Sequence, residues 1–263
     1  MKPRHVIGHF KGRHNTMKET VDKAYEMFAK YRADRPLDVC TDCCMKIEDE
    51  GRLASLPVRQ IPVDLLSEYN DSAKPDKTRI EEVKHFLPRY LDLISEYKFP
   101  THSAELSFSR LLPFDKNEWT SNELKLLKKF ATDFFIQTLQ TYPIPSFNDR
   151  IDTVLIMLWR AEFDIIELLK IWEKTDTLQS VLHFNDLYFE GFNEHNRSEL
   201  FSSFGDKELS EILTNWIDNE KTKEIFQERI ERVILGDFDI EERILNKLNL
   251  LYEIVRSEKK NAL

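Results

Sequence analysis

Apolar side chains recur every three to four residues along most of the chain, which is the spacing of one face of an α-helix. Residues 17–34 show this pattern clearly, with charged residues between the apolar positions. The same period returns in residues 80–94 and 124–139. We therefore predict an amphipathic helix in each of these three segments, with its apolar face turned toward a core.

Sequence signals for helix starts support these boundaries. Thr78 with Glu81, and Thr120 with Glu123, have the spacing of capping boxes. In a capping box each side chain accepts a hydrogen bond from the backbone amide at the other's position, which satisfies two amides of the first turn. We expect a helix to begin after each threonine.

The second half of the chain continues the helical pattern. Residues 151–159 and 163–172 are strongly apolar and predict either a hairpin of two helices or one buried helix. Gly205 before Asp206, and Gly236 before Asp237, each predict a helix stop followed by a cap. Four further segments have helical spacing, namely residues 177–190, 207–218, 220–235 and 239–256.

The fold class follows from these segments and from the scarcity of glycine. Only six glycines occur, whereas sheets joined by tight turns usually need more of them. No segment alternates apolar and polar residues as a half-buried strand does. We predict an all-α fold, either an irregular multi-helix bundle or an α-solenoid-like stack of helix pairs.

For the domain organisation we expect a basic N-terminal arm, residues 1–15, followed by a single all-helical domain, residues 16–263. The first 18 residues hold five Lys or Arg side chains, three histidines and no acid. Such a segment is either a nucleic-acid or membrane-surface arm or a loosely held polar terminus. Two prolines within residues 142–147 mark a subdomain break or a simple turn.

Charge and hydropathy narrow the classes of partner. The net charge of −9 argues against nucleic acid, because phosphate binding needs a basic face. No apolar run reaches the roughly 18 residues of a membrane-spanning helix. Neither an apolar signal sequence nor an even set of cysteines occurs, so we expect a cytoplasmic protein with reduced thiols.

All three cysteines lie within five positions, as Cys40, Cys43 and Cys44. The Cys40-x-x-Cys43 spacing lets two thiolates converge on one metal ion, with zinc as the candidate. A closed zinc site needs four ligands, so we name His85 as a further ligand, with the histidines of the basic arm as alternatives. Two other interpretations stay open: thiols that pack as small hydrophobic groups, and a redox pair, which would need a preceding strand.

Other candidate chemistry is sparse. Glu82 and His85 share one helix face, and paired copies of this spacing build di-iron sites in bundles, but only one copy occurs. P-loop, nucleophile-elbow, dinucleotide and His-Glu-x-x-His sequences are lacking, which disfavours an enzyme and leaves catalytic activity an open question. Aromatic residues crowd the stretch 184–204 and form either a surface for a protein partner or part of the core.

Three motifs stand in order in residues 40–89: the Cys40–Cys43 loop, the run Glu-Asp-Glu at 48–50, and Lys-His-Phe-Leu-Pro-Arg at 84–89. In these motifs the chain resembles an uncharacterised family of bacterial proteins. The family has no known activity, so the resemblance implies a bacterial origin and a common site for Cys40, Cys43 and His85.

These observations favour a cytoplasmic helical protein that works by binding another protein. Its acidity suits a basic partner, for example a toxin covered by an immunity or antitoxin protein. The alternative is a metal-dependent protein, for example a hydrolase, that uses Cys40 and Cys43 with His85.

Overall fold

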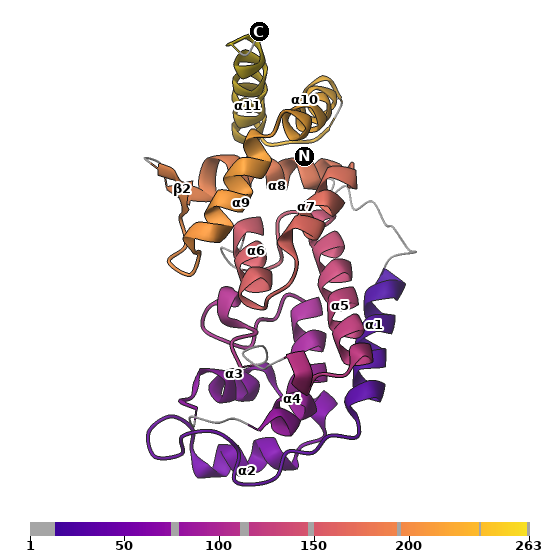
Figure 1. The fold of residues 1–263 in the computed structure, drawn as a ribbon, viewed down its shortest axis with the longest axis vertical. Coiled ribbons are helices and arrows are strands. Elements are labelled where there is room, and N and C mark those ends of the chain that lie inside the picture. The colour runs from indigo at the N-terminus through magenta and orange to yellow at the C-terminus, as the bar shows by residue number, and fades with distance from the viewer. Residues whose placement is uncertain are drawn as a thin grey trace, which may run out of the picture. The chain divides into compact units, whose positions relative to one another are not determined.

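Figure 1 shows the fold in a computed structural model, which describes residues 14–74, 79–110, 116–146, 150–193, 196–236 and 238–261. Eleven α-helices and one two-stranded sheet make up the regular structure of these residues. The predicted all-α fold is confirmed. Within the described ranges, no helix is long and apolar enough to cross a membrane.

The chain divides into two compact units that are interleaved in sequence. The first takes in the described residues up to 100 together with 116–137, and the second takes in 101–110 and those from 138 onward. The backbone therefore passes from one unit to the other three times. The basic arm at 1–15 lies outside the described residues except for its last two, which begin helix α1.

Five helices and two short 3-10 turns build the first unit, with α5 running on to the boundary with the second. Their bounds are α1 (His14–Phe28), α2 (Ile47–Ser55), η1 (Val58–Gln60), α3 (Val63–Asp71), α4 (Ile80–Ser95), η3 (Lys116–Glu118) and α5 (Ser121–Leu139). The three predicted amphipathic segments thus correspond to α1, α4 and α5.

Helix α1 packs against α4, and side-chain hydrogen bonds tie it to both α4 and α5. The Tyr25 hydroxyl donates to Asp92 of α4 at 2.8 Å, and Thr20 donates to Asp133 of α5 at 2.7 Å. The apolar faces of the three helices meet in an aromatic core. Its largest fully buried members include Phe28, Phe86, Tyr90, Phe130 and Phe134.

The second predicted capping box is confirmed and extends into this core. The Thr120 amide donates to the Glu123 carboxylate at 2.9 Å, and the Glu123 amide donates to the Thr120 hydroxyl at 3.3 Å. Glu123 also receives the ammonium of Lys84 at 3.0 Å, with 1% and 4% of the two side chains exposed. The first capping box includes Thr78, which lies outside the described residues.

The second unit combines helices with a small hairpin. Its elements are η2 (Ala104–Leu106), α6 (Ile151–Arg160), α7 (Ile165–Lys174), α8 (Leu178–Glu190), β1 (Phe192–Asn193), β2 (Asn196–Leu200), α9 (Lys207–Asp218), α10 (Glu220–Leu235) and α11 (Glu242–Asn261).

Helix α6 is the centre of this unit, because every residue from 151 to 158 is buried. A helix that is apolar on all sides must be covered on all sides, and η2, α7 and α8 all contact it. Of the two interpretations of residues 151–172, the helical hairpin is the one observed. The break falls at Glu162, whose φ is 59°, and Asp164 then caps α7 by accepting from the Glu167 amide.

The aromatic stretch 184–204 divides between core and surface. Phe184 is buried and stacks on Phe226 with ring centroids 3.8 Å apart, and Trp172 and Trp216 surround this pair. In contrast, 65% of Phe201 is exposed. The core interpretation therefore holds for the start of the stretch.

The hairpin of β1 and β2 was not predicted from the sequence. Its two strands pair antiparallel, with Phe192 opposite Leu200 and Asn193 opposite Asn196. β1 has only two residues, and β2 has five of which Leu200 alone is apolar, so neither strand shows an alternating pattern in the sequence. Burial of Phe192 and Leu200 on one side fixes the hairpin to the helices.

Candidate functional site

The three cysteines lie in a loop between α1 and α2 whose two ends are anchored in the first unit. The Cys40 amide donates to the carbonyl of Ala73 at 3.0 Å, and the Met45 amide closes the loop on the Cys40 carbonyl at 3.0 Å. Leu37 before the loop and Met45 after it are both buried. The sequence thus fixes both ends and leaves residues 41–44 exposed.

Two buried carboxylates support the segment that leads into the loop. Glu50 of α2 accepts from the Leu37 amide at 2.9 Å and pairs with Arg35, and Glu82 of α4 accepts from the Asp38 amide at 2.9 Å. The acidic run 48–50 lies in the first turn of α2, as predicted. Glu50 and Glu82 thus serve to hold the backbone and are engaged by donors of the protein.

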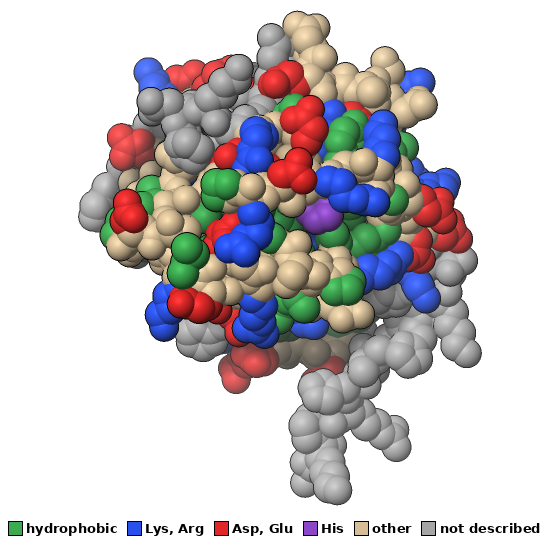
Figure 2. All heavy atoms as spheres, turned by 90° about the horizontal axis from the view of Figure 1, so that it is seen from below, with side chains coloured by type: hydrophobic (Ala, Val, Ile, Leu, Met, Phe, Trp, Pro, Cys, Tyr) green, Lys and Arg blue, Asp and Glu red, His purple; other side chains and the backbone are tan. Residues whose placement is uncertain are grey.

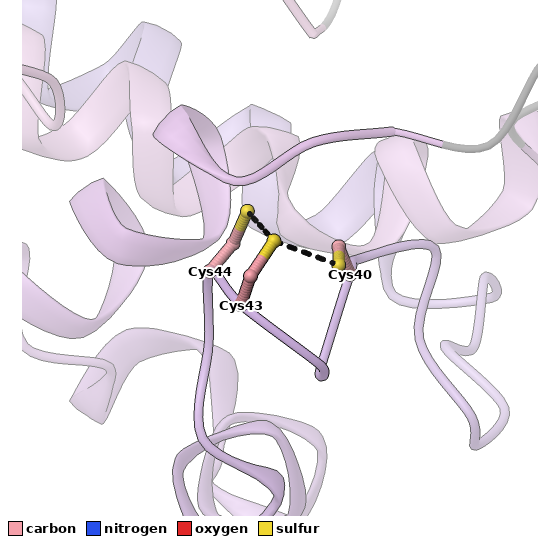
Figure 3. A group of neighbouring side chains, drawn as sticks. All are labelled: Cys40, Cys43 and Cys44. Atoms are coloured by element: carbon pink, nitrogen blue, oxygen red, sulfur yellow. Dashed lines mark hydrogen bonds between the residues drawn. The ribbon is translucent and has the colours of Figure 1, made fainter.

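The sulfur atoms of the three cysteines gather at one point (Figure 3). Cys43 Sγ lies 3.4 Å from Cys40 Sγ and 3.4 Å from Cys44 Sγ, and all three atoms lie within 4.8 Å of one another. We call these residues the thiol cluster. Cys43 and Cys44 are exposed and Cys40 is half-buried, so the cluster is open to solvent.

The local electrostatics favour a thiolate at Cys40. Hydrogen bonds from the Cys43 amide, the Cys43 thiol and the Asp42 amide lower the pKa of Cys40 below its usual value. Hydrogen bonds to Cys44 and Cys40, together with repulsion from their charge, raise the pKa of Cys43 to about 12. Three neighbouring thiolates repel one another. Metal ions bind the deprotonated form of cysteine, and the positive charge of a bound ion would offset this repulsion.

The structure brings Cys40 and Cys43 together, as their spacing suggested, but places His85 elsewhere. The Nδ1 atom of His85 lies 3.0 Å from the carbonyl oxygen of Tyr31, and its ring meets the ring of Phe86 edge-on at 4.9 Å. Because a carbonyl only accepts, Nδ1 carries the proton and Nε2 is an acceptor. In the described part of the chain, the atoms that gather for a metal ion are the three sulfurs, without His85.

The histidines named as alternatives give no further ligand. His5, His9 and the side chain of His14 lie outside the described residues. Residues 29–46 contain no strand, so the strand that a thioredoxin-like redox pair needs before its first cysteine is not found in this segment.

Cys44 is the member of the cluster that sequence reasoning missed. The expected Cys-x-x-Cys pair did not include Cys44 as a ligand, although its position next to Cys43 was a usable signal.

Comparison with known protein families, curated proteins and solved structures finds no match for this chain. The resemblance described for residues 40–89 therefore rests on its three motifs alone.

Proposed function

We propose that this protein binds a thiophilic metal ion through Cys40, Cys43 and Cys44, with Zn²⁺ as the first candidate. The observation that carries the proposal is the convergence of three sulfur atoms within 4.8 Å on an exposed loop. Thiolate ligands select soft or borderline ions such as Zn²⁺ and Cu⁺.

The distances between the sulfurs suit one shared ion. A tetrahedral zinc ion bonds sulfur at about 2.3 Å, which sets two ligating sulfurs about 3.8 Å apart. The two separations of 3.4 Å and the upper limit of 4.8 Å bracket that value. Small rotations of exposed side chains would complete the adjustment.

An open cluster of three protein ligands leaves one position of a tetrahedral ion for water or another molecule. Because the loop is exposed, a bound ion could exchange with solution, which suits reversible binding better than a purely structural role. Hydrolysis would need a general base beside the ion. The cluster contains only sulfur among the described residues, so we restrict the proposal to binding.

Competitive titration of the reduced protein with Zn²⁺ and a chromophoric chelator tests this function. We expect one ion per chain, and a loss of affinity of tenfold or more in Cys40→Ser, Cys43→Ser and Cys44→Ser. Asp42→Ser is the matched control, because it changes an exposed side chain of the same loop and keeps the amide that faces Cys40.

The same titration separates two ligand sets. If the thiol cluster is the site, Cys44→Ser weakens binding and His85→Gln leaves it unchanged. If the set is Cys40, Cys43 and His85, the outcomes are reversed. Equal zinc binding by the wild type and by a variant with all three cysteines replaced by serine would refute metal binding altogether.

A second candidate function is the binding of a basic protein. Exposed apolar side chains at the C-terminal helices favour a protein interface, and the net charge of −9 suits a basic partner. Leu235, Phe238 and Leu250 are exposed by 79%, 48% and 54%. On the face drawn in Figure 2, acidic and basic side chains are mixed, so the net charge of −9 is not gathered there. Stoichiometric capture of one basic protein, lost with Leu235→Glu and Leu250→Glu but kept with Ile166→Glu, would support this candidate.

A further inference from the structure

A pocket of about 500 Å³ opens in the second unit, away from the thiol cluster in sequence. Its walls come from the loop after α5, from α8 and from α11. Apolar surface is supplied by Pro143, Ile144 and Ile244, and polar groups line the remainder. This volume lies in the range of small-molecule sites, about 300–1,000 Å³. We call it the polar pocket.

One wall of the polar pocket holds a buried acceptor that no protein group satisfies. Asn185 is fully buried, its Nδ2 donates to Asp186 at 3.3 Å, and its Oδ1 has no hydrogen-bond partner. An unsatisfied buried acceptor costs about 1–3 kcal/mol. Natural proteins carry few such groups, so a donor from outside the protein is a direct explanation.

His183 adds a second acceptor to this wall. Its Nε2 lies 2.9 Å from the carbonyl oxygens of both Thr138 and Thr141. Two carbonyls can only accept, so Nε2 carries the proton and Nδ1 keeps its lone pair. Burial lowers the pKa of His183 to about 4, although the two carbonyls raise it, and the ring is neutral at pH 7.

Carboxylates continue the acceptor wall along α8. The Tyr142 hydroxyl is hydrogen-bonded to Asp186, whose pKa is raised by burial. Glu190, one turn further on, pairs with Lys247 of α11. Of the groups on this wall, Asn185 and Asp186 are therefore placed to receive N–H or O–H donors of a ligand.

The part of the lining that comes from α11 supplies positive charge. Arg243 and Lys247 are four residues apart and so share one helix face. Lys247 is neutralised by Glu190, whereas Arg243 is exposed and makes no ion pair with any described residue. Arg150 also lines the pocket, but its guanidinium is engaged by the Asp152 carboxylate at 3.0 Å. Arg243 is thus the cation available to an anionic group.

We infer that the polar pocket binds a small zwitterion of the amino-acid class. Its ammonium group would donate to Asn185 Oδ1 and to Asp186, and its carboxylate would pair with Arg243. With Glu190 paired to Lys247 and Arg150 paired to Asp152, Asp186 and Arg243 remain as lining groups of opposite charge, so a ligand that carries both charges matches them better than a pure anion or a pure cation. Pro143, Ile144 and Ile244 would face the ligand's side chain.

To test this inference, single L-amino acids are added to the full-length protein. Binding is measured first by thermal shift and then by calorimetry. We expect at least one to bind with 1:1 stoichiometry and to raise the melting temperature. Its N-acetyl derivative and its carboxamide should each bind about tenfold or more weakly, because each removes one charge-assisted contact.

Two variants with matched controls complete the test. Asn185→Leu removes the unsatisfied acceptor, so the ligand-free protein should fold at least as stably as wild type while binding falls tenfold or more. Arg243→Ala should also weaken binding tenfold, and Arg256→Ala, on the same helix and outside the pocket lining, should not.

Three results would overturn the inference. The first is that no L-amino acid shifts the melting temperature at millimolar concentration, even if Asn185→Leu is stabilising, since water alone would then satisfy Asn185. The second is binding that persists unchanged in both variants. The third is equal binding of the N-acetyl derivative or of inorganic phosphate.

Discussion

Glu123 shows how one side chain can serve a helix start and a core at once. Its carboxylate caps α5, and it also neutralises the buried ammonium of Lys84 and accepts from the Tyr31 hydroxyl. Removing one partner from a buried ion pair leaves an uncompensated charge, which typically costs about 3–5 kcal/mol. The pair therefore makes the interior of the first unit sensitive to single substitutions.

The pH dependence of this pair has a definite sign. Burial on its own would raise the pKa of Glu123, but hydrogen bonds from Tyr31, the Thr120 amide and Lys84 lower it to about 2 from the usual 4.5. A carboxylate with a lowered pKa stabilises the fold above its unfolded pKa. That stabilisation, on the order of 3 kcal/mol, is lost as the pH falls from about 4.5 toward 2.

We predict that Glu123→Gln lowers the free energy of unfolding by about 3 kcal/mol at pH 7, because it leaves Lys84 without its counter-charge. At pH 3 the difference from wild type should shrink to roughly half, since Glu123 of the unfolded chain is then protonated and must release that proton to form the pair on folding. Urea unfolding at both pH values measures it. Glu96→Gln, at an exposed pair with Lys98, should change stability by less than about 0.5 kcal/mol. A constant difference at both pH values would contradict the assignment.

For single residues, the sequence predicted local roles better than contacts with partners that are distant in the sequence. The capping role of Glu123 was visible from its spacing to Thr120, but its pairing with Lys84, 39 residues away, was not. The same holds for the candidate site. The convergence of Cys40 and Cys43 follows from their spacing, whereas the position of His85 depends on how α4 packs.

Among the elements, the C-terminal end of α7 depends on a residue from another helix. The carbonyls of the last helical turn have no amide partner within the helix. Arg229 of α10, largely buried, donates to the carbonyls of Trp172, Glu173 and Thr175. A guanidinium can reach several carbonyls because its donors lie in one rigid plane, and its charge suits the negative end of the helix dipole.

We predict that Arg229→Met destabilises the protein by about 2–3 kcal/mol, because three carbonyls lose a charged donor. Arg229→Lys should recover only part of this loss, since an ammonium lacks the planar fork. Arg232→Met is the matched control: Arg232 lies one turn away on α10, is exposed, and pairs with the exposed carboxylate of Asp176. Chemical denaturation compares the three, and equal losses for Arg229→Met and Arg232→Met would refute this account.

Helix boundaries with side-chain signals were predictable, and elements without periodicity were not. Asp206 caps α9 by accepting from the Leu209 amide at 2.8 Å, as the Gly205–Asp206 pair indicated. The second such pair includes Asp237, which lies outside the described residues. The hairpin of β1 and β2 was not predicted because β1 has only two residues and β2 contains a single apolar residue, Leu200.

For the whole molecule, the interleaving of the two units is the main organisational feature. Residues 101–110 come between α4 and α5 in sequence but belong to the second unit. There η2 contacts α6, the rings of Phe108 and Phe163 meet edge-on at 6.2 Å, and Ser202 donates to Glu105 at 2.9 Å. No local sequence pattern indicates such contacts, because they join residues far apart in the sequence, such as Ser202 and Glu105, which are 97 positions apart.

We predict that Phe108→Ala destabilises the second unit by about 3–5 kcal/mol, the usual cost of deleting a buried phenyl ring. Hydrogen exchange should show lost protection in α6 to α9 and unchanged protection in α1 to α4, although Phe108 is much nearer in sequence to Ser95, the last residue of α4, than to Ile151, the first residue of α6. Phe86→Ala, in the core of the first unit, should give the opposite pattern. Equal loss in both units for both variants would mean that they unfold as one.

The polar pocket could likewise not be predicted from the sequence. Its lining spans residues 142 to 247 and comes from three separate segments. Each polar residue of the lining, taken singly, looks like an ordinary polar position of a helix or loop. The unsatisfied oxygen of Asn185 becomes evident only when its surroundings are known in three dimensions.

The place of residues 101–110 in the second unit also bears on how the chain is made. Ribosomes add about 5–20 residues per second, so α6, against which this segment packs, is completed about 3–10 s after it. During that interval Phe108 of the nascent segment is without its eventual neighbours, and the first unit lacks α5 for the earlier part of it, because α5 is completed before α6. Translation speed between these points, and any chaperone that shields an aromatic side chain there, would therefore influence the yield of correctly folded protein.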